Sequence, residues 1–300
     1  QTLGKSKVIN SFCGMTITNE PRCTSCHVGY GWNDMREPPP QAENAVDCLV
    51  CHDTTGEYWK FPTLAGHPTY IPREWPKGSG KMVQPPDLER IARNVGASGR
   101  ANCGSCHFHG GGADGVKHGD LDTSLINPPK SLDVHMSPEG LNFGCSDCHT
   151  TMGHAVSGSR YQANARDTLG IDVPGHTDFS RASCESCHGL APHDKPKLND
   201  HVDKLACQTC HIPAFARGGV PTKTWWDWST AGRLDENGQP KKQLDDHGHP
   251  SYLSEKGDFR HGENVVPEYA WFDGTVKYTL AGDPLDIENP PVAINRVEGS

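Results

Sequence analysis

The sequence has little of the material from which an ordinary hydrophobic core is built. Only 34% of its 300 residues are hydrophobic and 7% are aromatic. No apolar run approaches the roughly 20 residues that cross a bilayer, and no signal peptide opens the chain, which suggests a mature or trimmed sequence. The net charge of −9 argues against a nucleic-acid partner. Glycine and proline are abundant, at 33 and 24 residues, so we expect a loop-rich chain ordered by cofactors.

Cysteine and histidine are plentiful by contrast. The chain has 13 cysteines and 17 histidines, and the pattern Cys-x-x-Cys-His occurs six times. Chance would give about 0.03 copies for this composition. The copies are Cys23/Cys26/His27, Cys48/Cys51/His52, Cys103/Cys106/His107, Cys145/Cys148/His149, Cys184/Cys187/His188 and Cys207/Cys210/His211.

This spacing is the attachment pattern of c-type haem. In a helical turn, positions i, i+3 and i+4 share one face, so both thiols reach the vinyl groups of one haem while the imidazole reaches its iron. Zinc sites and redox dithiols also use paired cysteines, but a zinc site needs no histidine after every second cysteine, and a redox fold needs no six dithiols. We therefore predict six covalent haems. Because their attachment is extracytoplasmic chemistry, we expect a periplasmic or extracellular location.

With about one haem per 50 residues, the haems themselves would form the core. We predict a mainly α and irregular multihaem cytochrome c fold, with short helices around a haem-packed core and small β-hairpins in the C-terminal part. Residues 1–211 would form the multihaem core, and residues 212–300 a haem-free segment packed on it. Between the second and third motifs, Asp87 can cap a short helix that Gly96 ends.

The C-terminal part carries turn and strand patterns in place of motifs. Asp273-Gly274 predicts a two-residue turn between strands at Tyr269–Phe272 and Thr275–Leu280, and Asn237-Gly238 predicts a second turn. The aromatic group Trp225, Trp226 and Trp228 is expected to cover a haem edge or fill a packing gap.

Histidine is also expected to supply most distal ligands. Six proximal histidines leave 11 of the 17, against only five methionines, and an iron with two axial histidines has no position for substrate. His154 and His193 each follow a motif histidine by five residues, about 7.5 Å along a helix, so each should ligate a neighbouring haem. The distal candidates are His118, His135, His154, His193 and His201, with His67 and His176 in reserve; any of them is alternatively a surface histidine. His247 and His249, in a polar turn, are expected to be solvated.

Four long segments carry a family resemblance. Asn19–Trp32, Asp47–Gly56, Gly110–Asp120 and Cys207–Gly219 closely resemble the octahaem tetrathionate reductase family of multihaem cytochromes, and the resemblance runs the full length of the chain. The family has eight haems, whereas this chain has six motifs. The resemblance therefore implies one motif upstream of the first residue and one downstream of the last, unless the protein is a shorter relative.

The resemblance further implies an active-site haem at Cys23, Cys26 and His27, with a lysine as its distal ligand. Lys60 is the expected lysine and Lys81 the alternative. The implied substrate is tetrathionate, split at its central S–S bond into two thiosulfates, with nitrite and hydroxylamine as other acceptors. Arg22 and Lys60 are the candidates for holding the anion, because both are close to the motif in sequence.

The unpaired Cys13 has two interpretations. It is either a buried free thiol or a thiol beside the first haem that exchanges with a sulfur substrate.

Two competing functions stay open. An electron conduit, either a shuttle or a subunit of a homo-oligomer or haem filament, would need no substrate chemistry; the haem-free tail after His211 argues weakly against a filament. Nitrogen chemistry like that of the hydroxylamine-oxidising cytochromes would need a tyrosine crosslink to a haem. The expected partners are an electron-donating redox protein or quinol-linked cytochrome, and a small anionic or nitrogenous acceptor.

Overall fold

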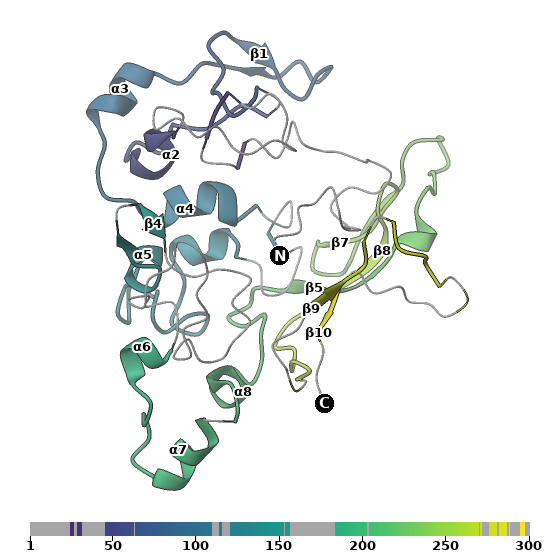
Figure 1. Cartoon of the computed structure of the whole chain (residues 1–300). Helices are drawn as coiled ribbons and strands as arrows, with labels where there is room; N and C mark the ends of the chain where they lie inside the picture. Colours follow the sequence, from purple (N-terminus) through teal and green to yellow (C-terminus); the bar gives the residue numbers. More distant parts are fainter. Residues whose placement is uncertain are drawn as a thin grey trace. The chain divides into compact units, whose positions relative to one another are not determined.

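A computed structural model of the whole chain forms two compact units, Gln1–Cys106 with Tyr269–Ser300, and His107–Glu268. The structure describes residues 25–26, 29–31, 46–62, 64–109, 114–115, 121–152, 154–156, 184–202, 204–269, 271, 276–280, 282–286, 288 and 295–297. The predicted division at residue 211 stays a prediction. Each unit is described by itself (Figure 1).

The first unit holds short helices and two-stranded sheets. Its elements are α2 (Cys48–His52), β1 (Arg73–Glu74), β2 (Met82–Val83), α3 (Leu88–Arg93), most of α4 (Arg100–His107), β9 (Val276–Tyr278) and β10 (Asn295–Val297). β1 pairs antiparallel with β2, and β9 pairs antiparallel with β10.

Helix α3 forms where the sequence predicted a helix, although it ends earlier. The Asp87 side chain accepts a hydrogen bond from the Arg90 backbone N–H at 3.0 Å, which confirms the cap, and Ile91 is completely buried. The C-cap is Asn94, not Gly96. Gly96 is used elsewhere, because its N–H donates to the carbonyl oxygen of His52 at 2.9 Å.

The predicted hairpin around Asp273-Gly274 is wrong in its pairing. β9 lies inside the expected second strand, but its partner is β10, with Lys277 opposite Arg296. Tyr269 and Trp271, the described residues of the expected first strand, are not in a strand. The turn pair itself lies outside the described residues. The sequence pattern located β9 but did not identify its partner.

The second unit combines short helices with the largest described sheet. Its elements are η2 (Thr123–Ile126), α5 (Cys145–Cys148), β3 (Thr151–Met152), β4 (Ala155–Val156), α6 (Glu185–His188), α7 (Pro196–Val202), α8 (Cys207–His211), β5 (Thr222–Asp227), η4 (Trp228–Thr230), β6 (Lys242–Leu244), β7 (Pro250–Leu253) and β8 (Gly257–Gly262). The sheet has the order β5-β8-β7-β6, with all neighbours antiparallel.

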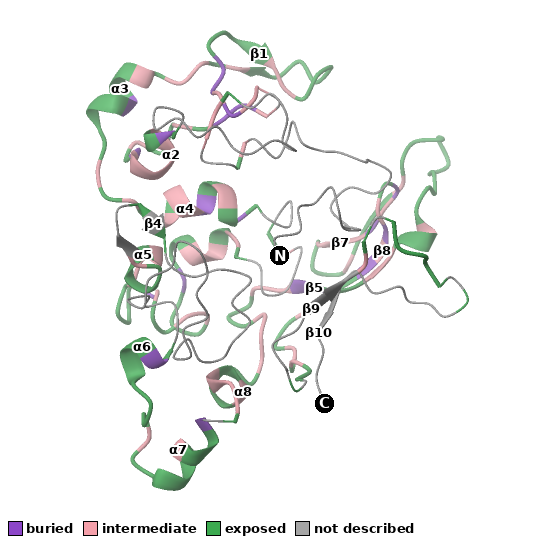
Figure 2. Ribbon diagram, viewed as in Figure 1, coloured by how far each residue is buried: buried purple, intermediate pink, exposed green. Residues whose placement is uncertain are grey.

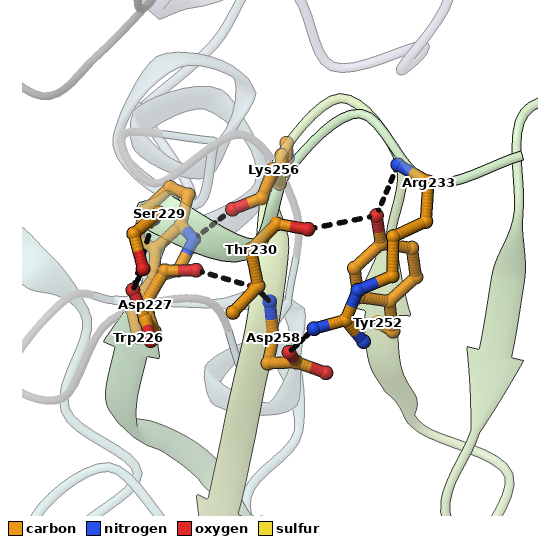
Figure 3. A network of polar contacts seen from close by, with 8 residues as sticks. All are labelled: Trp226, Asp227, Ser229, Thr230, Arg233, Tyr252, Lys256 and Asp258. Atoms are coloured by element: carbon orange, nitrogen blue, oxygen red, sulfur yellow. Dashed lines mark hydrogen bonds and ion pairs between the residues drawn. The ribbon is translucent and has the colours of Figure 1, made fainter.

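A polar network ties the connection after β5 to this sheet (Figure 3). The buried Tyr252 hydroxyl accepts from the Arg233 backbone N–H at 2.8 Å and donates to the Thr230 carbonyl at 3.1 Å. Asp258 accepts from the Arg233 guanidinium at 3.0 Å, and its own backbone N–H donates to the Thr230 hydroxyl at 2.8 Å. These bonds satisfy the polar groups that the turn brings against the sheet, so the region is fixed without a large apolar core.

The tryptophans of this region pack on one another and on the sheet. Trp226 and Trp228 stack with ring centroids 4.4 Å apart, and the Trp226 indole N–H donates to the Lys256 carbonyl. The predicted Asn237-Gly238 turn is present, with the Gly238 N–H donating to the Asp235 carbonyl at 3.0 Å. Whether the tryptophans also cover a haem edge stays a prediction.

Within the described residues, the polypeptide buries few apolar side chains by itself. Figure 2 shows buried positions as short, separated segments along ribbons that are mostly exposed or intermediate. The hydrophobic residues found buried in the part of the chain that the structure describes are Phe61, Ile91, Phe108, Val202, Tyr252 and Phe259. The described residues form short helices, irregular connections and a small antiparallel sheet in the C-terminal part, as the sequence analysis expected. No described helix is long and apolar enough to cross a membrane.

Candidate functional site

Five of the six motifs lie on helical turns, as their spacing predicted. α2, α4, α5, α6 and α8 carry the second to sixth motifs, with the two cysteines of each three residues apart, and Cys184 of the fifth motif is the N-cap of α6. α5 ends one residue before its histidine, His149, which forms the C-cap. Of the first motif, Cys26 is described, whereas Cys23 and His27 lie outside the described residues, as do Cys13 and Arg22.

Many of the described motif thiols lie at the surface of the polypeptide. Cys187 and Cys210, the second cysteines of the fifth and sixth motifs, are exposed. The helices that carry them, α6 and α8, are short and bury only the Glu185 side chain, so the polypeptide itself does not cover these two thiols. The other exposed motif thiols are Cys26, Cys48, Cys148 and Cys184, while Cys51, Cys103, Cys106, Cys145 and Cys207 are half-buried.

This exposure suits a thiol that must react with a haem. A cysteine forms a bond to a bulky partner only when its sulfur is accessible, whereas a fully buried thiol is inert. Cys187 and Cys210 are accessible, so their position fits haem attachment. Attachment at these two residues stays a prediction, and so does the haem-packed core.

The second motif shows a histidine prepared to bind a metal. The Nδ1 atom of His52 lies 2.7 Å from the carbonyl oxygen of Gly96, which can only accept a hydrogen bond, so Nδ1 carries the proton. The other ring nitrogen, Nε2, then carries the lone pair that can bind a metal. Histidines that ligate metals are commonly oriented by such a bond to a backbone carbonyl. His52 therefore fits a haem iron.

His193 faces the histidine of the sixth motif, not that of its own. Its Nε2 lies 3.4 Å from the Nε2 of His211, and the two rings are nearly parallel, at 10°. Asn199 fixes the tautomer: its amide nitrogen donates to the His193 carbonyl, so its oxygen accepts from His193 Nδ1 at 3.1 Å. Two imidazole nitrogens sharing one metal would be about 4 Å apart, with about 2.0 Å per bond. The pair thus fits the two faces of one haem iron.

His135 approaches the histidine of the fifth motif in a similar way. Its ring centroid is 6.2 Å from that of His188, with the rings at 68°. Ring centres about 6 Å apart are expected when both nitrogens bind one metal. Phe143 stacks on His135 at 6.4 Å and its backbone N–H donates to the His135 carbonyl at 2.9 Å. The arrangement therefore fits His135 as the distal ligand of the haem iron that His188 would bind.

The other predicted distal histidines are not brought to a motif histidine by any described ring contact. His154 lies at an exposed turn between β3 and β4 with φ of 66°, and His201 is exposed in the last turn of α7. His67 contacts Tyr30 and Tyr70. In the turn predicted to be solvated, His247 is exposed, but His249 is only partly so and packs 5.2 Å from His261. His118 and His176 lie outside the described residues.

Neighbouring motifs approach one another. The Cys26 thiol hydrogen-bonds to the Cys106 thiol, which with burial raises the pKa of Cys106. Cys184 of the fifth motif lies beside Cys207 of the sixth. The pKa of Cys184 is raised, mainly by burial and to a smaller extent by Cys207. Gly29, just after the first motif, forms an antiparallel bridge with Val46, just before the second. Haems held at these cysteines would lie close together.

Lys60 is buried where three motifs meet. Its Nζ donates to the Gly29 carbonyl oxygen at 2.6 Å and lies 3.9 Å from the Asp47 carboxylate. Burial lowers the pKa of Lys60, while the negative charge of Asp47 opposes that shift; the thiols of Cys26, Cys51 and Cys106 also lie nearby. Only 2% of its side chain is exposed. The alternative lysine, Lys81, is exposed on the connection before β2.

The sequence analysis missed two residues that hold this lysine in place. Asp47 caps α2 by accepting from the Leu49 N–H at 3.2 Å, and it also accepts a hydrogen bond from the hydroxyl of the half-buried Tyr58. Burial and the Asp47 carboxylate raise the pKa of Tyr58, which therefore stays protonated. An aspartate directly before the motif could have indicated the cap, but nothing local in the sequence indicates its contact with Lys60.

Comparisons with known proteins identify the family of this chain. The crystal structure of an octahaem cytochrome c from Shewanella oneidensis matches with 42% sequence identity and a TM-score of 0.74, over 99% of this chain and 59% of that chain. This chain belongs to that family of multihaem c-type cytochromes. A family model described as bacterial cytochrome c matches residues 223–300. No curated protein matches the sequence.

Membership confirms the resemblance inferred from the motif segments, and it establishes c-type haem as the cofactor of this electron-transfer cytochrome. The cytochrome spans about three fifths of the Shewanella protein's length. The number of haems and the substrate are therefore matters for proposal. Among the described residues, no cluster of three or more His, Cys, Asp or Glu side chains could hold a metal ion by itself.

Proposed function

We propose that this cytochrome carries electrons along six c-type haems to the haem at Cys23, Cys26 and His27, which reduces tetrathionate. In that reaction the central S–S bond breaks, two electrons enter, and two thiosulfate anions leave, so no proton is consumed. The haems would supply the electrons. The observation that carries the proposal is the buried Lys60 beside Cys26.

Lys60 has the environment that an iron-binding or anion-binding lysine needs. An amine binds iron only when neutral, and burial favours the neutral form. The bond to the Gly29 carbonyl uses one N–H and so restricts the direction in which the lone pair points. Asp47 favours the ammonium form, which would attract an anionic substrate. Lys60 is therefore suited to both roles: the neutral amine would bind the haem iron, and the ammonium form would attract an anion that replaces it there. Cys13 stays a candidate for exchange with the sulfur substrate.

The histidine pairs support the electron-carrying half of the proposal. An iron with imidazole on both faces transfers electrons but has no position for substrate. Two such haems would have these axial ligand pairs: His193 with His211, and His135 with His188. His118, His154 and His201 stay candidates for the remaining distal positions.

These same pairs favour a second function, a conduit without substrate chemistry, either a shuttle or a subunit of a filament. The two functions differ at the first motif. A histidine on the distal face of the first haem would favour the conduit, whereas Lys60 at that position favours the reductase.

The test is an anaerobic stopped-flow experiment on the fully reduced holoprotein. Tetrathionate, nitrite and hydroxylamine are added in turn, and haem reoxidation is followed by absorbance. The proposal predicts fast, saturable oxidation by tetrathionate. No oxidation by any acceptor, with all haems intact, would establish the conduit instead.

The proposed setting follows from covalent haem attachment. We place the cytochrome in the periplasm or outside the cell. There it would accept electrons from a redox protein or a quinol-linked cytochrome, and its net charge of −9 favours a donor with a basic docking surface.

A further inference from the structure

The loop after Lys60 contains a hollow of about 300 Å³. The residues that line it are Leu64, His67, Pro68, Tyr70, Ile71 and Arg73. Three of these side chains are apolar, three carry polar groups, and none is a carboxylate. In a protein with a net charge of −9, a hollow with this lining favours an anionic ligand.

The walls of the hollow are built by short-range hydrogen bonds. The His67 N–H donates to the Leu64 carbonyl at 2.9 Å, and the His67 carbonyl accepts from the Phe61 N–H at 3.0 Å. Gly66, with φ of 86°, packs so tightly on Gly29 that a Cβ atom would lie 2.6 Å from the Gly29 carbonyl oxygen. The same Gly29 oxygen accepts a hydrogen bond from Lys60, so the Gly29 carbonyl contacts both the lysine and the loop that forms the hollow.

Arg73 supplies the positive charge. Its guanidinium carbon lies 6.0 Å from the centroid of the Phe61 ring, and no described carboxylate pairs with it. The neighbouring Glu74 is on the opposite face of β1, because successive strand residues alternate. The Glu74 carboxylate accepts from the Gly80 N–H at 2.6 Å instead. The charge of Arg73 is thus available to a ligand.

Tyr70 supplies a hydrogen-bond donor that His67 positions. The His67 Nδ1 atom lies 3.3 Å from the Tyr70 hydroxyl, and the His67 ring packs on Tyr30 with centroids 5.1 Å apart. When Nδ1 donates, the phenol oxygen accepts and its own proton is left to donate to a ligand. A cationic fork and a hydroxyl on an apolar wall match an oxoanion attached to an apolar group.

We infer that this hollow is a docking subsite for a sulfonate-type oxoanion. The identity of the ligand rests on the proposed function. Tetrathionate has sulfonate ends on an apolar disulfide centre, and thiosulfate shares the sulfonate group. Arg73 and Tyr70 would hold the sulfonate oxygens while Leu64 and Ile71 contact the sulfur chain.

The test is equilibrium binding to the oxidised holoprotein, measured by titration calorimetry with tetrathionate and with thiosulfate separately. Arg73→Gln should weaken the binding of the docked anion about tenfold, and Tyr70→Phe about threefold. The matched control is Lys77→Gln, which removes a positive charge from the exposed connection between β1 and β2 without touching the hollow. The Lys77→Gln variant should bind the anion with an affinity within about twofold of that of the unsubstituted protein.

The outcomes separate this inference from the proposed function. If tetrathionate binds and the binding depends on Arg73, the subsite binds the substrate. If only thiosulfate binds in this way, the subsite binds the product. Such binding in a protein without reductase activity would keep the subsite and reject the reductase. Equal binding in Arg73→Gln and the original protein, or an equal loss in Lys77→Gln, overturns the subsite even when tetrathionate is reduced normally.

Discussion

Replacing Lys60 with methionine tests the proposed substrate site most sharply among single substitutions. The change removes the amine but keeps an unbranched apolar stem, so the buried space stays filled. The half-buried Gly29 carbonyl loses the Lys60 donor, and an unsatisfied acceptor costs at most about 1–3 kcal/mol. Asp47 keeps the Tyr58 hydroxyl and the Leu49 N–H as partners. The variant should therefore fold and attach its haems.

The effect on activity should be much larger than the effect on stability. Removing a preorganised group that binds a developing or incoming anion in a dry site typically costs about 100-fold in turnover. We expect kcat/KM for tetrathionate to fall by about that factor in Lys60→Met. The matched control is Lys81→Met, because Lys81 is exposed. Unchanged turnover in Lys60→Met, or an equal loss in Lys81→Met, would refute the assignment.

Three further predictions concern other parts of the chain. His193→Ala should leave His211 without its facing imidazole, so one haem should become high-spin and rise in potential, as measured by spectroscopic redox titration. An unchanged spectrum would show that His193 is no ligand. Ile91→Ala should lower the free energy of unfolding by about 2–5 kcal/mol in urea titrations, because Ile91 is completely buried in α3; a change below about 1 kcal/mol would contradict its core position. Burial and the charge of Lys256 lower the pKa of Lys223 to about 8, so the unfolded chain binds the extra proton above that pH, and stability should rise between about pH 8 and 10.5. Thermal unfolding should show this rise relative to Lys223→Met, and parallel curves would contradict it.

Local patterns predicted the helical turns of the motifs and the Asp87 cap. These features depend on residues within one or two turns of each other, so their spacing carries the information. The same geometry predicted that His193 ligates a haem other than that of His188, and in the structure His193 lies against His211; the ligation itself stays a prediction. The identity of its partner, His211, depends on how α8 folds back, which no local pattern encodes.

Long-range contacts account for what the sequence left open. The pairing of β9 with β10 joins strands separated by an intervening segment, and the turn pattern at Asp273-Gly274 could not reveal it. Lys60 was predicted from a family resemblance, but its burial depends on Gly29 and Asp47, which reach it through the bridge between Gly29 and Val46. The hollow at Arg73 likewise forms only when β1 and the loop after Lys60 come together.

The measurement that tests the central claim most directly is a product count. Fully reduced holoprotein is mixed anaerobically with a limiting amount of tetrathionate, and thiosulfate is quantified against the electrons lost by the haems. The account predicts two thiosulfates for every two electrons, with haem reoxidation to match. Haems that stay reduced while tetrathionate is recovered unchanged would contradict it.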